Sequence, residues 1–196
     1  MMTVRQIERL WDNQNYQRLC REVVAIRPEA PVVLELDASS AIPAAALGMV
    51  RLDELNQSHT ALYGRLLRLV LGRQEADGGW GDAVTTALCL KALLAGQGNG
   101  LAIDRGIAYL AALQKPEGTW PRVPLRRMPA DAAVSAFILY CLADVARFRE
   151  SVQFDQAVQW FESHGDELDD GTARLWQSAR LRCRITRPPA TEASWS

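Results

Sequence analysis

An acidic run near the C-terminus is the first place where residue types and spacing could do chemistry. Glu167, Asp169 and Asp170 stand within four positions of one another, directly before Thr172 and Ala173. Clustered carboxyl groups are a residue type used for general acid and base catalysis. The same run could instead cap the next helix, because acidic side chains are stabilised at the positive end of a helix. The residues alone leave both interpretations open.

A second candidate site is a proline-rich segment that carries three arginines. Arg122, Arg126 and Arg127 lie between Pro121 and Pro129, just before an apolar stretch. Guanidinium groups could hold an anionic head group or an acidic partner through charge-assisted hydrogen bonds. The alternative is a solvated loop in which the arginines contribute little.

The sulfur and imidazole side chains do not form a metal-binding pattern. They are spread singly along the chain, with no C-x-x-C pair and no shared ligand spacing. In chain order they are Cys20, His59, Cys89, Cys141, His164 and Cys183. We expect no metal and no cofactor, and we expect the cysteines to be small buried apolar residues.

Composition and charge restrict the class of protein. Hydrophobic residues make up 48% of the 196 residues, which is ordinary for a globular chain. Lys and Arg number 22 against 23 Asp and Glu, so no global positive field is available to attract nucleic acid. No run of eighteen apolar residues and no signal-peptide pattern occurs. We therefore expect a cytoplasmic protein with no membrane span and no nucleic-acid partner.

An internal repeat organises the middle of the chain. Residues 65–80 align without a gap on residues 105–120, and the two copies are 40 positions apart. Each copy ends with Gln, three residues, Gly, one residue and Trp. The repeated residues are Gln74, Gly78 and Trp80 in the first copy and Gln114, Gly118 and Trp120 in the second.

Each repeat predicts a helical hairpin. After each Trp a helix begins at Asp82 or Asp131 and is apolar around nearly its whole circumference, which is typical of a buried helix. The acidic residue stands where free backbone N–H groups need an acceptor. The helix before each turn keeps exposed arginines such as Arg65 and Arg105. Each repeat is thus predicted as an outer helix, a tight Gly turn and a buried inner helix.

This pattern resembles the QW motif of squalene-hopene and terpene cyclases, whose α/α-toroid fold is shared by prenyltransferase β subunits. The resemblance covers residues 65–142 well and residues 155–183 weakly. It implies that the Gln ties the outer helix to the amide end of the next inner helix and that the Trp stacks over it. The six repeated Gln, Gly and Trp residues would then be structural latches. The residue chemistry agrees, because an amide both donates and accepts and an indole excludes water.

We therefore predict an all-α chain forming a partial α/α toroid of about four helix hairpins. The first 57 residues are expected to hold a helix near Val4 to Val23 and another over residues 43–55. The predicted domain is residues 1–184, with repeats at 65–95 and 105–147, a degenerate repeat at 155–184 and a flexible tail at 185–196.

The resemblance supplies the favoured functional hypothesis. Toroids of that family close a ring of about six helix pairs around an apolar cavity, and about four pairs leave an open flank. We expect a homodimer or a protein partner to cover that flank. The favoured hypothesis is a non-catalytic binding or assembly module that holds a partner or an apolar ligand on its inner-helix face.

The alternative is an isoprenoid enzyme or enzyme subunit of the class II terpene cyclase kind. Its acidic motif, Asp-x-Asp-Asp followed by Thr-Ala, resembles Glu167 to Ala173, with Glu167 in place of the first Asp and Gly171 inserted. The resemblance implies that Asp169 donates the proton and that Asp170 and Glu167 raise its pKa by like-charge proximity. A third reading, the carbohydrate-active toroids, needs a pair of carboxylates flanking a groove, and no convincing pair stands out.

Overall fold

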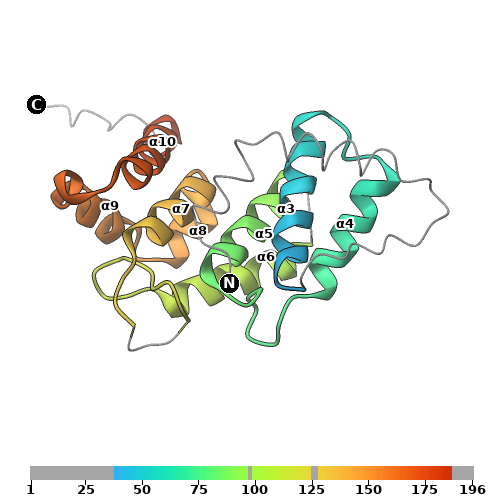
Figure 1. The fold of residues 1–196 in the computed structure, drawn as a ribbon, viewed down its shortest axis with the longest axis horizontal. Helices are drawn as coiled ribbons and strands as arrows, with labels where there is room; N and C mark the ends of the chain where they lie inside the picture. Colours follow the sequence, from blue (N-terminus) through green and yellow to red (C-terminus); the bar gives the residue numbers. More distant parts are fainter. Residues whose placement is uncertain (1–37, 97–98, 125–127, 187–196) are drawn as a thin grey trace, which may run out of the picture.

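A computed structural model of the chain describes residues 38–96, 99–124 and 128–186. Over these residues the fold is helical: eight α-helices, α3 to α10, and one 3-10 turn, with no strand (Figure 1). The prediction of an all-α chain is confirmed for this part. None of these helices is long and apolar enough to cross a membrane.

The helix bounds follow the predicted hairpins closely. The helix expected over residues 43–55 corresponds to α3. The tail expected from residue 185 begins within the last turn of α10, and its residues 187–196 lie outside the described residues. The helix expected near Val4 to Val23 also lies outside the described residues. The elements are α3 (Ala38–Glu54), α4 (Ala61–Gly72), α5 (Ala83–Ala95), α6 (Gly100–Leu113), α7 (Ala132–Leu142), α8 (Ala146–Ser151), α9 (Phe154–Ser163), the 3-10 turn (Gly165–Glu167) and α10 (Asp170–Thr186).

The helices form two layers, which we call the inner row and the outer layer. The inner row consists of α3, α5, α7 and α10, which pack against one another in that order. The outer layer consists of α4, α6, α8 and α9; α4 packs on α3, and α6 packs on α5 and α8. Figure 1 shows α3 and α10 towards opposite ends of the molecule, with α5 and α7 between them.

Burial separates the layers as their hydrophobic patterns predict. Ten of the 13 residues of α5 and eight of the 11 residues of α7 are buried. By contrast, α4 buries only Tyr63 and Val70, and its Arg65 and Arg68 are exposed. A helix that is apolar on all sides is stable only when other helices surround it. This is why α5 and α7 occupy the middle of the inner row.

Both predicted helix starts are capped as expected. Asp82 accepts a hydrogen bond from the backbone N–H of Thr85 at 2.8 Å, and Asp131 accepts one from that of Val134 at 3.0 Å. Each carboxylate thereby satisfies one of the free N–H groups in the first turn of its helix. The caps fix where α5 and α7 begin, and so they fix the length of each turn.

Candidate functional site

The two repeat turns are held by their glutamines. The Gln74 side-chain amide donates to the carbonyl of Gly78 at 2.9 Å and to that of Ala102 at 2.8 Å. The Gln114 amide donates to the carbonyl of Gly118 at 2.8 Å, and its oxygen accepts from the backbone N–H of Gln153 at 2.7 Å. Each glutamine therefore closes its own turn and also reaches a distant segment.

The distant partner of each glutamine differs from the one that the resemblance implied. Ala102 belongs to α6, and Gln153 directly precedes α9 as its N-cap residue. Both stand at the start of an outer helix, whereas the expected partner was the amide end of the next inner helix. The glutamines thus join α4 to the start of α6, and α6 to the start of α9.

The two tryptophans make identical hydrogen bonds ten residues back along the chain. The Trp80 indole N–H donates to the carbonyl of Val70 at 2.7 Å, and that of Trp120 donates to the carbonyl of Leu110 at 2.8 Å. Both carbonyls lie in the last turn of an outer helix, and each also accepts from the backbone N–H of the C-cap residue, Arg73 or Gln114. Both indoles are buried. Each buried tryptophan therefore adds a second hydrogen bond to the C-terminal end of its outer helix and shields that end from water.

A hydroxyl on the inner helix completes each turn. The backbone N–H of Trp80 donates to the Thr86 hydroxyl at 2.9 Å, and that of Trp120 donates to the Ser135 hydroxyl at 2.8 Å. Thr86 and Ser135 are both fully buried and stand four residues after their capping aspartates. This contact is a part of the latch that the sequence pattern had not identified.

The acidic motif occupies the same position as the two helix caps. Asp169 accepts hydrogen bonds from the backbone N–H of Thr172 at 3.1 Å and from the Thr172 hydroxyl at 2.8 Å. Asp82 makes the same two bonds to Thr85, at 2.8 and 3.1 Å. In this register Ala173 replaces Thr86 and Ser135, so the third repeat has lost the hydroxyl together with the Gln and the Trp.

The surroundings of the acidic motif are those of a helix start. Glu167, Asp169 and Asp170 are all exposed, and Asp169 also accepts from the backbone N–H of Gly171 at 3.0 Å. A proton donor aimed at an alkene needs a carboxyl group that burial keeps neutral, and none of these three carboxyl groups is buried. The structure therefore assigns this cluster a capping arrangement.

The arginine loop is only partly described. Arg122 forms an ion pair with the capping residue Asp131, with 2.9 Å between the Arg122 Nε and the Asp131 Oδ2 atoms. Arg126 and Arg127 lie outside the described residues. The base of the loop is closed by the backbone N–H of Asp131, which donates to the carbonyl of Trp120 at 2.9 Å. Despite the longer loop, the backbone N–H of Trp120 reaches Ser135 of α7 as that of Trp80 reaches Thr86 of α5.

A cluster of two cations and an aromatic ring lies on the inner row, and the sequence pattern gave no sign of it. Lys91 of α5 and Arg182 of α10 stand over the ring of Tyr140 of α7, with the Lys91 Nζ and Arg182 Cζ atoms 4.4 and 4.8 Å from the ring centroid. Arg182 also donates to the carbonyl of Tyr140 at 3.1 Å. All three residues are half-buried. We call these three residues the inner-face cluster.

Burial shapes the electrostatics of this cluster. It lowers the pKa of the Lys91 ammonium, and Arg182 lowers that pKa further. Burial also raises the pKa of the Tyr140 hydroxyl, while Arg182 opposes the increase. Contributions of cation–π contacts at partly exposed sites are about 0.5–1 kcal/mol each. The cluster therefore concentrates positive charge where water is partly excluded.

The cysteines behave as small core residues. Cys89 and Cys141 are buried, and burial raises the pKa of both thiols, that of Cys141 to about 11. Cys183 is half-buried and Cys20 lies outside the described residues. Within the described ranges no group of three or more His, Cys, Asp and Glu side chains is placed to hold a metal ion.

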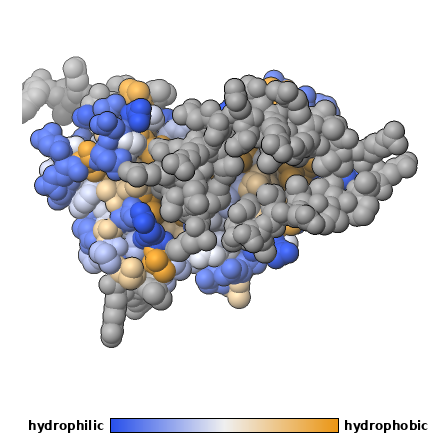
Figure 2. Space-filling view, viewed as in Figure 1, coloured by the Kyte–Doolittle hydropathy of each residue, from blue (hydrophilic) through white to orange (hydrophobic). Residues whose placement is uncertain are grey.

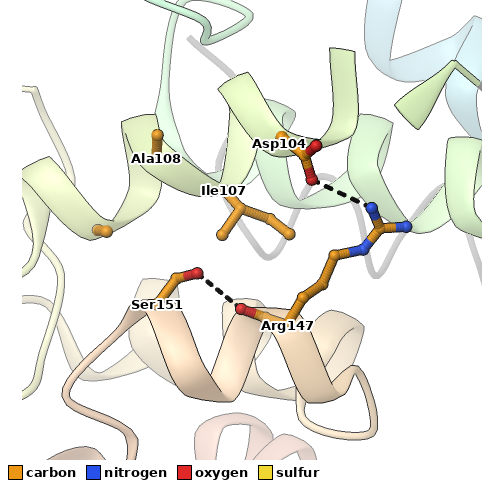
Figure 3. A pocket seen from close by; sticks show the side chains of 6 residues that line it. Asp104, Ile107, Ala108, Arg147 and Ser151 are labelled. Atoms are coloured by element: carbon orange, nitrogen blue, oxygen red, sulfur yellow. Dashed lines mark hydrogen bonds and ion pairs between the residues drawn. The ribbon is translucent and has the colours of Figure 1, made fainter. Parts of the chain in front are cut away.

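A groove of about 420 Å³ lies in the outer layer between α6 and α8 (Figure 3). Arg147 of α8 and Asp104 of α6 form an ion pair across it, with 3.1 Å between their side-chain atoms. The lining consists of Asp104, Ile107, Ala108, Ala111, Arg147 and Ser151. It contains neither the acidic motif nor Arg122, and no sequence motif had indicated it.

Comparison with known proteins finds no matching family model, no matching curated protein and no matching solved structure.

Proposed function

We propose that this chain is a non-catalytic binding or assembly module built like a partial α/α toroid of the QW-repeat family. Its inner-helix face holds a protein partner, a second copy or an apolar ligand. The inner-face cluster is the observation that carries this proposal. Its three side chains come from three different inner helices. The cluster therefore forms only when the helices of the inner row are packed together.

The geometry of the carboxylates supports a binding role over the enzymatic alternative. Asp82, Asp131 and Asp169 all accept hydrogen bonds from the first turn of an inner helix. The alternative is a class II terpene cyclase-like enzyme that uses Asp169 as the acid. Since Asn caps a helix about as well as Asp, Asp169→Asn preserves the fold and removes only the acid. Turnover of a polyprenyl substrate by the wild-type protein that is abolished in this variant would favour the enzyme.

The proposal is tested by native mass spectrometry of freshly purified protein, which reports both subunit count and retained small molecules. We expect a second subunit or a lipid-sized adduct in the wild type, reduced in Arg182→Gln. The matched control is Arg180→Gln, on the same helix, where Arg180 is exposed and pairs with Glu162 at 3.6 Å. A bare monomer, or equal retention in both variants, contradicts a stable complex at the inner-face cluster.

A further inference from the structure

The groove between α6 and α8 has a charged end and an end without charge (Figure 3). At the charged end, Arg147 and Asp104 form their ion pair at 3.1 Å. At the other end, the Ser151 hydroxyl donates to the carbonyl of Arg147 at 2.7 Å, so its proton is already used within α8. The charged groups that a ligand can contact are therefore gathered at one end of the groove.

The wall that α6 contributes is apolar beyond its charged end. Ile107, Ala108 and Ala111 follow Asp104 at the spacing of one helix face. Because each alanine side chain is a single methyl group, the space between α6 and α8 stays open. Asp104 and Ala111 are seven residues apart, which is about 10 Å along the helix. A groove of this length, with a volume of about 420 Å³, suits a small molecule.

Contacts outside the groove hold its two helices in place. Phe148 of α8 is fully buried and stacks on Trp120 of the second repeat turn, with 6.2 Å between the ring centroids. Just after α8, the backbone N–H of Gln153 donates to the side-chain oxygen of Gln114, which follows the last residue of α6. The groove is therefore preformed, and a ligand does not have to order its walls in order to bind.

The ion pair at the charged end can be exchanged for contacts with a ligand. The Arg147 and Asp104 side chains are 44% and 65% exposed. Exposed ion pairs contribute little to stability, so separating these two charges costs little. A ligand with one charge pairs with one of the two residues and takes it from the other. A ligand that carries both charges replaces one ion pair with two, which favours a zwitterion.

The surface beside α8 favours a small ligand over a protein partner. Helices α9 and α10 follow α8 in the chain, and on the face shown in Figure 2 their end of the molecule carries hydrophobic residues scattered among hydrophilic ones. Sites for protein partners more often present a continuous apolar patch. On this face the surface therefore offers no broad apolar extension of the groove.

We propose that the groove between α6 and α8 binds a free α-amino acid with a large apolar side chain. Arg147 holds the carboxylate and Asp104 holds the ammonium group, in place of their own ion pair. The apolar side chain of the ligand lies along Ile107 and the two alanines. This site is in the outer layer, so it does not depend on the function proposed for the inner-helix face.

Titration of the full chain with L-phenylalanine and L-leucine, followed by its amide NMR signals, tests this site. We expect saturable shifts at residues of α6 and α8. N-acetyl-L-phenylalanine keeps only the carboxylate, and L-phenylalaninamide, at a pH where its amine is protonated, keeps only the ammonium group. These two compounds represent the ends of a peptide, and each should bind about 3- to 5-fold more weakly than L-phenylalanine, the scale of one exposed ion pair.

Two results of this titration would overturn the proposal. One is the absence of saturable shifts in α6 and α8 with both free amino acids. The other is binding of N-acetyl-L-phenylalanine or L-phenylalaninamide that is as tight as that of L-phenylalanine, because the groove would then recognise one end of a peptide and not a zwitterion.

Three variants test whether the binding occurs in the groove. Arg147→Gln and Asp104→Asn each remove one charge and should weaken L-phenylalanine binding by about 3- to 5-fold. Ala108→Leu, at an exposed position, fills the apolar part and should abolish binding with both charges in place. The control is Glu150→Gln, at an exposed position of α8 outside the groove. Binding by the folded Arg147→Gln or Ala108→Leu protein that equals binding by the control would contradict the site.

Discussion

At the residue scale, three aspartates show how position decides chemistry. Asp82, Asp131 and Asp169 each accept hydrogen bonds from the third residue of the helix that follows. Asp169 stands in an acidic run and so invites a catalytic interpretation, yet its partners are those of Asp82. The chemistry of a carboxylate is set by the donors around it, and these donors come from the folded helix start.

The glutamine and tryptophan of a repeat turn should each contribute measurably to stability. Gln114→Ala removes hydrogen bonds that join α6 to α9 and is expected to lower the free energy of unfolding by about 1–3 kcal/mol. Trp120→Ala also leaves a large cavity and should cost about 3–5 kcal/mol. Urea denaturation measures both. Gln159→Ala, at an exposed position of α9, is the control for Gln114, and equal midpoints in the two Gln variants would contradict the latch.

One buried hydroxyl is expected to be dispensable. The Tyr63 side chain is 4% exposed, its hydroxyl lies against Gly96, and this hydroxyl makes no hydrogen bond with the described residues. A buried polar group without a partner destabilises the folded state. Tyr63→Phe should therefore leave the free energy of unfolding unchanged or raise it by up to about 1 kcal/mol. A thermal melt would show this as an unchanged or higher melting temperature. A clear fall would reveal a partner for this hydroxyl.

At the element scale, the two repeat turns have the same conformation because both need a glycine at the same position. Gly78 and Gly118 have φ values of 94° and 87°, in the left-handed region that side chains disfavour. Both also touch the next outer helix: a Cβ atom would lie 2.5 Å from the Arg105 carbonyl oxygen at Gly78 and 2.3 Å from the Ala157 nitrogen at Gly118. The turn and the packing of successive outer helices are thus one structural unit.

Alanine substitution should separate this constraint from ordinary helical glycine. Gly118→Ala is expected to destabilise by at least ~2 kcal/mol, because the backbone is left-handed and α9 must move. Gly72→Ala, in the last turn of α4 with open space around it, should stabilise by up to about 1 kcal/mol. Thermal unfolding of both variants gives the comparison. Similar shifts of the same sign would show that Gly118 is not held as described.

At the scale of the whole molecule, the two layers give the chain one continuous core. Residues from every helix of the inner row, and from the outer layer, join a single hydrophobic cluster. The third repeat lacks the Gln, the Trp and the buried hydroxyl, and aromatic stacking takes their place. Phe161 stacks on Trp176 at 4.9 Å, and Trp160 stacks on His164 at 4.4 Å. Within the last hairpin, α9 and α10 are therefore joined by the stacked rings of Phe161 and Trp176 rather than by a latch of their own.

The core thiols predict a loss of stability in alkaline solution. The pKa of Cys141 is about 11 when folded, against about 9 for an exposed thiol. Between these values the unfolded chain releases the proton and the folded chain keeps it, so the free energy of unfolding falls as pH rises from 9 to 11. In urea denaturation at pH 8 and pH 10.5, the stability advantage of the wild type over Cys141→Ala should shrink. A constant difference would place Cys141 in contact with water.

Much of the helical plan was predictable from the residues. The apolar circumference of α5 and α7 predicted buried helices, and Asp82 and Asp131 predicted their starts, because both signals act within a few residues of the chain. The hydroxyls of Thr86 and Ser135 could have been found by the same alignment, as a polar residue repeated within an apolar helix. The groove between α6 and α8 left no signal, since its walls come from two helices that interact only through tertiary packing.

By itself, the sequence determined the helices, their caps and the two glycine turns, because hydrogen bonds and φ preferences over a few residues decide these features. Only the tertiary structure decided what the turns join and which side chains meet on the inner row. Gln114 reaches Gln153 across 39 positions, and Lys91, Tyr140 and Arg182 come from three helices. Such contacts depend on how the helices stack, and stacking minimises the exposed apolar area of all of them together.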